Sequence, residues 1–353
     1  MKELAIGQVK IGAGHPTVVI AEIAECHNGS METAKRMVDA IKVAGAQVAK
    51  FQLHLPGWEM APKTIKLGGV LFDDILKNTF TSAEHKELME YCESVGVEYL
   101  CTPFCPRGAE VLNDLGVKAF KTGSGELTNL PQHRVLAKIS AKTGKPVIVS
   151  TGMCKWEEIR ETVQVYEDEG AKDNLVLMNC TSEYPPNNYA NVRLRLIPRL
   201  QNEFEVWVGQ SDHTTDNYTA FAAVALGAKI VEKHFTLSRK MEGPDHAIAL
   251  EPDMLKELVD GIRKTEAAVN APPNKDVLGD EAPVRHWAFH SVVTNRRIKK
   301  GERITLKNVR PARPGWGIPA KFLDGEYVRQ LLGKRAKKNL PKNAVVYWED
   351  LEK

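Results

Sequence analysis

The sequence lacks any long hydrophobic segment. No apolar run approaches the roughly 18 residues that a membrane span needs, and the N-terminus, Met-Lys-Glu-Leu-Ala-Ile-Gly, has too few apolar residues for a signal peptide. Excess charge is also small, since 48 lysines and arginines stand against 45 aspartates and glutamates, for a net charge of +3. So balanced a chain indicates neither a nucleic-acid partner nor a membrane partner.

Cysteines are few and scattered, so a disulfide framework is not expected. Most of the six lie beside apolar runs, and we expect reduced thiols in a cytoplasmic protein. Cys101-Thr-Pro-Phe-Cys105 has a spacing that could suit a metal, but no second pair follows, and we interpret it as a strand end. A Gly-rich dinucleotide-binding fingerprint is likewise missing after the first apolar run.

The sequence does contain a regular series of short apolar runs, each followed by a helix-like segment. Continuous hydrophobicity is typical of strands buried on both faces. Eight such units predict a closed (β/α)8 barrel, whereas a doubly wound open sheet is disfavoured by the count and by the missing fingerprint. The expected strands are Thr17–Ile20, Gln47–Phe51, Val97–Thr102, Val117–Thr122, Pro146–Ser150, Leu175–Asn179, Val206–Gln210 and Lys229–Glu232.

Two of the intervening helices carry clear start signals. Ser30 can cap a helix whose apolar face includes Met37, Ile41 and Val43. Thr81-Ser-Ala-Glu84 has the pattern of a capping box. These signals support helices between the first three strands.

The chain changes character after the last expected barrel helix, residues 253–270. A Pro-rich break follows, and we divide the chain into a barrel domain (1–270), a linker (271–288) and a small β-rich domain (289–353). The small domain contains a weak repeat, in which residues 298–309 align with residues 340–351. We expect a pseudo-twofold arrangement of β-hairpins.

Two of the expected strands lead into histidines. Val206-Trp-Val-Gly-Gln-Ser-Asp-His213 and Lys229-Ile-Val-Glu-Lys-His234 would place His213 and His234 side by side at the carboxyl ends of neighbouring strands. Two neutral imidazoles can bind a divalent transition metal and leave positions for substrate oxygens. The alternative is a pair of hydrogen-bonded histidines at the barrel rim.

Polar residues collect at the other strand ends as well, where barrel enzymes have their active sites. Lys50, Lys121 and Ser124, with the backbone N–H groups of residues 123–125, could bind a phosphate or carboxylate. Lys121 could instead form a Schiff base. Glu22 and Glu126 are candidates for general acid or base, or for holding sugar hydroxyls, as is Asp245 in a turn after the eighth strand.

These motifs together resemble the sialic acid synthases, the phosphoenolpyruvate-dependent nonulosonate synthases. Each motif is short, but they occur in the family's order over nearly the whole chain. They are Ala21-Glu-Ile23, His27-Asn-Gly29, Lys50-Phe-Gln52, Thr102-Pro-Phe104, Lys121-Thr-Gly-Ser-Gly-Glu126, Ser150-Thr-Gly-Met153, Cys180-Thr-Ser-Glu-Tyr-Pro185, Ser211-Asp-His213, Glu232-Lys-His-Phe235, Gly243-Pro-Asp245, Ile298-Lys-Lys-Gly-Glu302 and Arg313-Pro-Gly315.

The resemblance implies a (β/α)8 barrel followed by an antifreeze-like (SAF) domain, in a domain-swapped homodimer. It implies a transferase that condenses phosphoenolpyruvate with an N-acetylmannosamine-type sugar, with a divalent metal, usually manganese, on His213 and His234. Glu22 would act near the reacting carbons. The resemblance places Lys50, Thr102, Lys121, Ser124, Ser182, Ser211 and Arg313 around phosphoenolpyruvate, and Gln52, Glu126, Tyr184 and Asp245 around the sugar.

The sequence departs from the family at two places. Ala24-Glu25-Cys26 stands where members usually have Gly followed by small or apolar residues, and residues 66–69 offer no sugar-contacting Asn. The sugar therefore stays open between N-acetylmannosamine, its 6-phosphate and a 2,4-diacetamido-trideoxy hexose.

Other functions fit the sequence less well. A deoxy-heptulosonate or deoxy-octulosonate phosphate synthase is the main alternative, and the C-terminal repeat disfavours it. An ice-binding module, suggested by the small domain alone, leaves the polar strand ends without a purpose. An inactive barrel is disfavoured because the two histidines, Lys50, Lys121 and Arg313 are all present.

Overall fold

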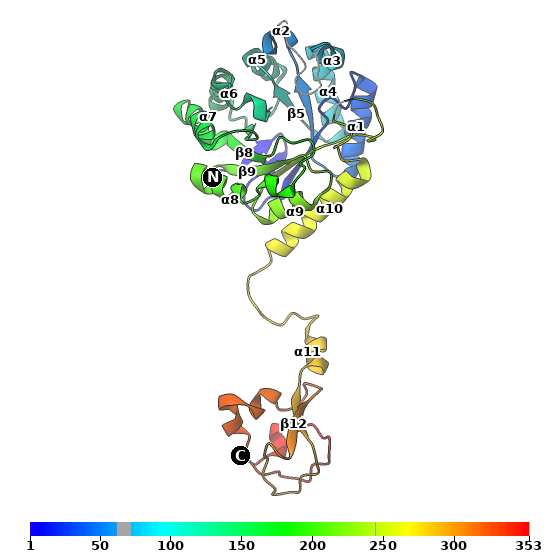
Figure 1. Ribbon diagram of the computed structural model, residues 1–353, viewed down its shortest axis with the longest axis vertical. Helices are drawn as coiled ribbons and strands as arrows, with labels where there is room; N and C mark the ends of the chain where they lie inside the picture. Colours follow the sequence, from blue (N-terminus) through cyan, green and yellow to red (C-terminus); the bar gives the residue numbers. More distant parts are fainter. Residues whose placement is uncertain (62–71, 244, 353) are drawn as a thin grey trace. The chain divides into compact units, whose positions relative to one another are not determined.

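The computed structural model describes residues 1–61, 72–243 and 245–352, and the chain divides into two compact units (Figure 1). The first unit is Met1–Ala271 and the second is Pro272–Lys353. Residues 66–69, where the sequence offers no sugar-contacting Asn, lie outside the described residues. Within the described ranges, no helix combines the length and the apolar character that crossing a bilayer requires.

The first unit is built on a sheet of eight parallel strands, and every apolar run expected to be a strand forms one. The order in the sheet is β5-β4-β3-β10-β9-β8-β7-β6. This confirms the barrel-type prediction. The strands are β3 (Val18–Glu22), β4 (Val48–Leu53), β5 (Glu98–Pro103), β6 (Phe120–Thr122), β7 (Val147–Ser150), β8 (Leu175–Cys180), β9 (Trp207–Asp212) and β10 (Ile230–His234).

At the seam between β5 and β6, a side chain from the helix that follows β6 bonds the end of β5. These two strands lie beside each other, but no ladder pair joins them among the described residues. The fully buried Gln132 donates from Nε2 to the carbonyl of Pro103 at 2.8 Å. Because an unpaired buried carbonyl is costly, this bond stabilises the end of β5 against the helix at Leu130–Thr143.

Helices surround the strands, as Figure 1 shows. Ser30 and Thr81 cap their helices as expected, the latter in a capping box with Glu84. Val43 was wrongly placed on the apolar face, because it is 81% exposed. Helical periodicity puts Met37 and Ile41 toward the sheet and turns the residue two positions after Ile41 away from it. The helices are α1 (Met31–Ala44), α2 (Pro56–Glu59), α3 (Phe72–Asn78), α4 (Ser82–Val95), α5 (Pro106–Leu115), α6 (Leu130–Thr143), α7 (Trp156–Asp168), α8 (Leu196–Phe204), α9 (Tyr218–Ala225) and α10 (Pro252–Val269).

An unexpected hairpin covers the amino-terminal end of the sheet. Strands β1 (Leu4–Ile6) and β2 (Val9–Ile11) pair antiparallel, and Leu4, Ile6 and Ile11 join one cluster with apolar barrel residues. The sequence could not reveal this hairpin because strands of three residues are too short to show periodicity. It packs apolar residues against the end of the barrel opposite the polar strand ends.

The second unit contains a short helix, α11 (Ala282–Ala288), followed by the antiparallel strands β11 (Ser291–Thr294) and β12 (Val309–Ala312). Helix α11 lies in the stretch expected to be a linker. The buried side chains of this unit form their own core, made of Val292, Ile298, Ile304, Val309, Ile318, Leu331, Ala336, Leu340, Val346 and Leu351. The second unit therefore has the hydrophobic core that a separate domain needs.

The repeat in the second unit is visible in its backbone. Ile298 and Leu340, the first residues of the two copies, exchange backbone hydrogen bonds of 2.9 and 2.8 Å. Three residues later, Gly301 and Asn343 both have positive φ, at 81° and 63°. Glycine and asparagine are the residues that most readily adopt this conformation, so each copy makes the same turn.

The ends of the two copies also match. Asn308 accepts the backbone N–H of Thr305 at 2.8 Å, and Asp350 accepts that of Tyr347 at 2.9 Å. All four residues occupy equivalent positions in the alignment of residues 298–309 with 340–351. The repeat predicted from sequence is therefore a repeat of turns and side-chain caps.

The hairpin over the barrel end gives a stability prediction. Ile6→Ala removes a fully buried side chain, and we expect the free energy of unfolding of the barrel unit to fall by about 2–5 kcal/mol. Val43→Ala, which truncates an exposed side chain, is the control and should change it by less than about 0.5 kcal/mol. Urea unfolding followed by circular dichroism measures both. Equal effects would contradict the packing role of the hairpin.

Candidate active site

One cavity, of about 330 Å³, brings together all but one of the residues selected from the sequence. Arg313 is the exception, because it belongs to the second unit. There it donates from Nε to the carbonyl of Ala288 at 2.9 Å, and its guanidinium lies 5.4 Å from the ring centre of Trp287. The selected residues in the cavity are Glu22, Lys50, Gln52, Thr102, Lys121, Ser124, Glu126, Ser182, Tyr184, Ser211, His213, His234 and Asp245.

The alternation of side chains along each strand explains this gathering. Along β3, Val18 and Ile20 lie in the apolar cluster with the hairpin, and Glu22, two residues on, lines the cavity. Along β10, Ile230 lies in that cluster and Glu232 and His234 line the cavity. Since every second residue of a strand points to the same face, these strands change from apolar to polar along their inner face.

Four charged side chains form the centre of the site. The Nζ of Lys50 lies 3.0 Å from Glu22 Oε2 and 3.4 Å from Glu232 Oε1. The Nζ of Lys121 lies 3.6 Å from the same oxygen of Glu232 and donates to Ser150 Oγ at 2.6 Å. All four are at least 94% buried. Two carboxylates and two ammonium groups thus neutralise one another away from water.

The two carboxylates of this cluster differ in their acidity. Burial raises the pKa of Glu22, and the nearby Lys50 does not fully offset it. Burial also acts on Glu232, but Lys121 and Lys50 outweigh it and bring the pKa of Glu232 down to about 2. Burial lowers the pKa of Lys121 below its ordinary value, against the attraction of Glu232. Glu22 is therefore the better proton acceptor and Glu232 the permanent counter-ion.

Glu232 is the functional residue that the sequence reasoning missed. In the sequence it is the last residue of the eighth expected strand and the first of a motif, and no role is assigned to it there, although its place between Ile230 and His234 follows the strand period of two. Its Oε1 accepts from Ser211 Oγ at 3.2 Å, whereas its Oε2 is buried without a hydrogen-bond partner. Ser150, Cys180, Phe104 and Met153 line the cavity as well.

Small polar groups lie beside the lysines. Ser124 Oγ accepts the backbone N–H of Gly152 at 2.9 Å, and the buried Oγ of Ser182 has no hydrogen-bond partner. A Cβ on Gly152 would come within 2.4 Å of Ser182 Oγ and 2.6 Å of Ser124 Oγ, so only glycine fits here. Unpartnered buried hydroxyl and carboxylate oxygens indicate room for a polar ligand.

The two histidines face each other, with ring centres 5.4 Å apart. Nδ1 of His213 bonds the carbonyl of Thr181 at 2.7 Å, so that nitrogen carries the proton and Nε2 keeps its lone pair. Burial and the neighbouring His234 lower the pKa of His213 to about 3. Nδ1 of His234 is buried without a hydrogen-bond partner.

This pair fits a divalent metal. Neutral imidazoles with an oriented second nitrogen are suitable ligands. Within the described ranges, no group of three His, Cys, Asp or Glu side chains could hold a metal ion. A metal at this pair would therefore take its remaining ligands from substrate or water.

A second group of side chains lies where a neutral polar ligand could bind. The ring of Tyr184 stacks on His213 with centres 4.0 Å apart. Gln52 donates from Nε2 to Glu22 Oε1 at 2.7 Å. Asp245 Oδ2 lies 3.8 Å from His234 Nδ1. Burial raises the pKa of Glu126 to about 7, against the effect of Lys121.

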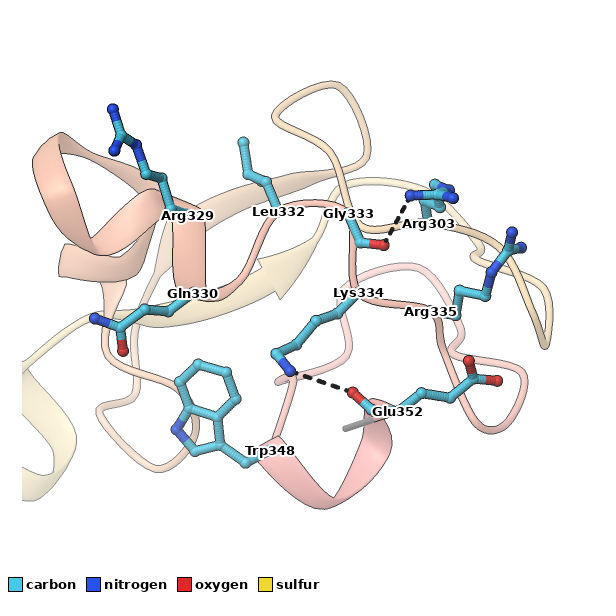
Figure 2. Close-up of a pocket in the computed structure, with 9 residues that line it drawn as sticks. All are labelled: Arg303, Arg329, Gln330, Leu332, Gly333, Lys334, Arg335, Trp348 and Glu352. Carbon is cyan, nitrogen blue, oxygen red and sulfur yellow. Dashed lines mark hydrogen bonds between the residues drawn. The ribbon is translucent and has the colours of Figure 1, made fainter.

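A hollow of about 800 Å³ in the second unit has a different character. Figure 2 shows the basic side chains Arg303, Arg329, Lys334 and Arg335 around it, with Trp348 and Glu352. Arg335 donates to the carbonyl of Gly301 at 2.8 Å, and the arginines are exposed. Since it lacks a buried acid, base or nucleophile, it is a solvated basic face and not a second catalytic centre.

None of the six cysteines, all of which lie in the described ranges, forms a disulfide. The Cys101–Cys105 pair lies at a strand end, as expected. Cys105 caps the helix that follows, because its Sγ accepts the N–H of Gly108 at the start of α5. Burial raises the pKa of Cys180, the cysteine that lines the cavity. It is therefore a poor nucleophile.

Comparison with known proteins gives a consistent picture. The model of the NeuB family matches residues 37–272, and that of the SAF domain matches residues 289–352. The N,N'-diacetyllegionaminic acid synthase of Legionella pneumophila is 33% identical over 97% of this chain and 96% of its own length. The human N-acetylneuraminate-9-phosphate synthase is 33% identical over 84% of this chain and 83% of its own.

A solved structure agrees with these relatives. The N-acetylneuraminic acid synthetase of Leptospira borgpetersenii, in complex with citrate, superposes with a TM-score of 0.70 at 27% identity. The match covers 80% of this chain and 95% of that one. The relatives and this structure are named as synthases of nonulosonic acids.

The raised pKa of Glu126 gives a pH prediction. In the native state Glu126 keeps its proton until about pH 7, whereas the ordinary value is 4.5. The unfolded chain therefore loses this proton first, and stability falls as pH rises from about 4.5 to about 7. At pH 8 we expect Glu126→Gln to unfold at a higher urea concentration than the wild type. Its free energy of unfolding should be greater by up to about 3 kcal/mol.

At pH 4 the two proteins should differ little, because both states of the wild type are then largely protonated. Glu87→Gln removes a surface carboxylate that pairs with Lys35 at 2.6 Å and serves as the control. A constant difference between Glu126→Gln and wild type at pH 4 and pH 8 would contradict the buried, protonated carboxyl.

Proposed function

The chain belongs to the NeuB family of nonulosonic acid synthases, and we propose that it condenses phosphoenolpyruvate with an N-acetylmannosamine-type aldose. The products are a nonulosonic acid and inorganic phosphate. The observation that carries this proposal is the buried cluster of Lys50 and Lys121 with Glu22 and Glu232, beside the His213–His234 pair. One cavity thus contains two cationic side chains for the phosphate, a carboxylate that can act as a base, and a pair of metal ligands.

The lysine side of the cavity suits phosphoenolpyruvate. The Nζ of Lys50 faces Glu22, Glu232 and Thr102 Oγ1, and that of Lys121 faces Glu232, Ser150 Oγ and the carbonyl of Thr122. Several of these contacts are long, at 3.4 to 3.6 Å, so an anion could replace them. Hydroxyl groups of Thr102, Ser124, Ser182 and Ser211 surround them. We assign the phosphate and carboxylate of phosphoenolpyruvate to this side. The unpartnered Ser182 Oγ supports the assignment.

The opposite side of the cavity suits the open-chain sugar. Gln52, Glu126, Tyr184 and Asp245 supply amide, carboxyl and phenol groups that match hydroxyl and acetamido groups. With its pKa raised to about 7, Glu126 can donate or accept a hydrogen bond near neutral pH. A divalent metal on His213 and His234, manganese by the resemblance, would supply Lewis-acid polarisation of the sugar aldehyde.

In the reaction that we propose, C3 of phosphoenolpyruvate attacks the aldehyde carbon, and the aldehyde oxygen takes a proton from solvent. Positive charge develops at C2, where the Glu22 carboxylate stabilises it. Water adds to C2 and loses a proton to Glu22, which the raised pKa favours. The C2–O bond to phosphate then breaks as the C2 hydroxyl becomes the ketone, and phosphate leaves with the bridging oxygen and the proton of that hydroxyl. Lys50 and Lys121 hold the anion in line with the aldehyde.

We also propose the domain-swapped homodimer and the phosphoenolpyruvate contact of Arg313 that the sequence resemblance implies. A SAF domain at residues 289–352 supports this part of the proposal. In its own unit Arg313 is exposed and spends only Nε on a backbone carbonyl. The terminal nitrogens of its guanidinium would be available to an anion.

The proposed reaction predicts metal-dependent phosphate release. With Mn²⁺ and phosphoenolpyruvate, we expect phosphate release only when an N-acetylated hexose is present. The sugars to compare are N-acetylmannosamine, its 6-phosphate, a 2,4-diacetamido-trideoxy hexose, arabinose 5-phosphate and erythrose 4-phosphate. Turnover with arabinose 5-phosphate or erythrose 4-phosphate alone would show that the protein is a deoxy-sugar phosphate synthase. No turnover with any sugar would reject the proposed reaction.

The role of the histidine pair is tested in the same assay. His213→Ala should lower kcat/KM by about 100-fold or more in metal-supplemented buffer, because one of only two protein ligands is lost. His15→Ala is the matched control, since His15 pairs with Glu3 and does not line the cavity. Full activity of His213→Ala would refute the metal assignment.

A further inference from the structure

The unusual Glu25 of the first-strand loop is buried against a histidine. Its side chain is 11% exposed, and its Oε1 lies 3.3 Å from Nε2 of His54. His54 follows β4 and is itself 6% exposed. The other ring nitrogen, Nδ1, lies 2.7 Å from Glu59 Oε1 in α2. An imidazole is therefore held between two carboxylates just behind the cavity wall.

The same histidine contacts residues that line the cavity. Nε2 of His54 lies 3.1 Å from Gln52 Oε1, and Gln52 in turn donates from Nε2 to Glu22 Oε1 at 2.7 Å. The ring of His54 stacks on that of Phe104, with centres 4.3 Å apart and planes 10° apart. A continuous path of contacts joins the loop carboxylates to Glu22.

The atoms around His54 fix its protonation. Among the residues that the structure describes, both ring nitrogens face acceptors, namely the carboxylates of Glu25 and Glu59 and the amide oxygen of Gln52. A neutral imidazole donates from one nitrogen only, so its other lone pair would face an oxygen lone pair. The doubly protonated ring satisfies every one of these contacts.

The charged ring also fixes the Gln52 amide. Because Nε2–H donates to Oε1 of Gln52, the NH2 group of Gln52 is directed toward Glu22. Without that proton, Gln52 could rotate its amide and bring Oε1 against the Glu22 carboxylate, which is repulsive. The orientation of the Gln52 amide in the cavity is thus set by His54, which lies outside the cavity.

We infer that His54, held as an imidazolium by Glu25 and Glu59, is a positioning residue that orients Gln52 and through it Glu22. His54 does not line the cavity, so it would touch neither substrate. Its consequence for catalysis rests on the proposed function, in which Gln52 holds the sugar. Glu25, the departure of this chain from its family, thereby acquires a role in sugar recognition.

The surrounding charges agree with this geometry. Burial lowers the pKa of His54, but Glu25 and Glu59 outweigh it and raise the pKa to about 9. Other titratable groups that interact with His54 are His27 and His85, both with pKa values lowered to about 4 by burial, and Glu126. The two other histidines are thus neutral at pH 7 and do not oppose a charge on His54. The carboxylates bind opposite nitrogens of the ring, which excludes a shared metal.

The inference is tested first without any substrate. In the full chain labelled with ¹³C-histidine, the His54 signal is assigned by its loss in His54→Gln. We expect it to titrate near pH 9 in the wild type and at least about one pH unit lower in Glu25→Gln and in Glu59→Gln. The control Glu87→Gln, on an exposed surface, should leave it unchanged.

A His54 signal that titrates near 6.5, the ordinary value for histidine, would overturn the inference. So would a titration that neither loop variant moves. The use of two variants covers a failure of one to fold, and thermal melts identify such a failure. This measurement decides the inference even if none of the sugars is turned over, in which case only the proposed reaction fails.

The second test separates the two substrates. With the sugar that is turned over, Glu25→Gln should raise KM for the sugar by about 10-fold and leave KM for phosphoenolpyruvate within about 2-fold. In the wild type, KM for the sugar should rise as pH passes about 9, and in Glu25→Gln it should rise at lower pH. A merely structural role would lower activity at every pH without changing the pH at which KM for the sugar rises. That result would overturn the inference.

Discussion

The buried charge cluster of Lys50, Lys121, Glu22 and Glu232 is the constraint on which the rest of the structure depends. Removing four charges from water is costly, and pairing recovers only part of that cost. Such a cluster persists when a fold holds its members at close range, as the strand ends of a barrel do. Each ammonium group makes one long contact with Glu232, at 3.4 Å from Lys50 and 3.6 Å from Lys121, so an acidic ligand can replace this weak contact with a closer one. This arrangement favours function over stability.

The fold supports the cluster through a change of polarity along the barrel. Apolar side chains and the β1–β2 hairpin pack the amino-terminal end. On the same inner face of the strands, the side chains at the carboxyl end are charged. The rigid apolar end fixes the strand register. Around the cluster, His213 is oriented by a backbone carbonyl, and Gln52 by His54. His213 and Gln52 are thus each held by a neighbour that does not line the cavity.

Much of this could be predicted from the sequence, because it depends on local periodicity. Continuous apolar runs located all eight strands, and the polar residues at their ends located the cavity. The β1–β2 hairpin has strands too short to show a pattern. Val43 was misplaced because its apolar character was considered without its position around the helix axis. Glu232 and the Glu25–His54–Glu59 contacts depend on pairing between distant segments, which one sequence does not reveal. The resemblance to a known family supplied roles, whereas the geometry supplied the neighbours.

The most direct test of the charge cluster as an anion site is calorimetric titration of phosphoenolpyruvate into the full chain without sugar. Lys121→Met should weaken binding by about 30-fold or more, the loss expected when one partner of a buried charge contact is removed. Lys118→Met, at an exposed lysine three residues earlier, is the matched control. Wild-type affinity in Lys118→Met together with the loss in Lys121→Met would support the account. Equal affinity in all three proteins would contradict it.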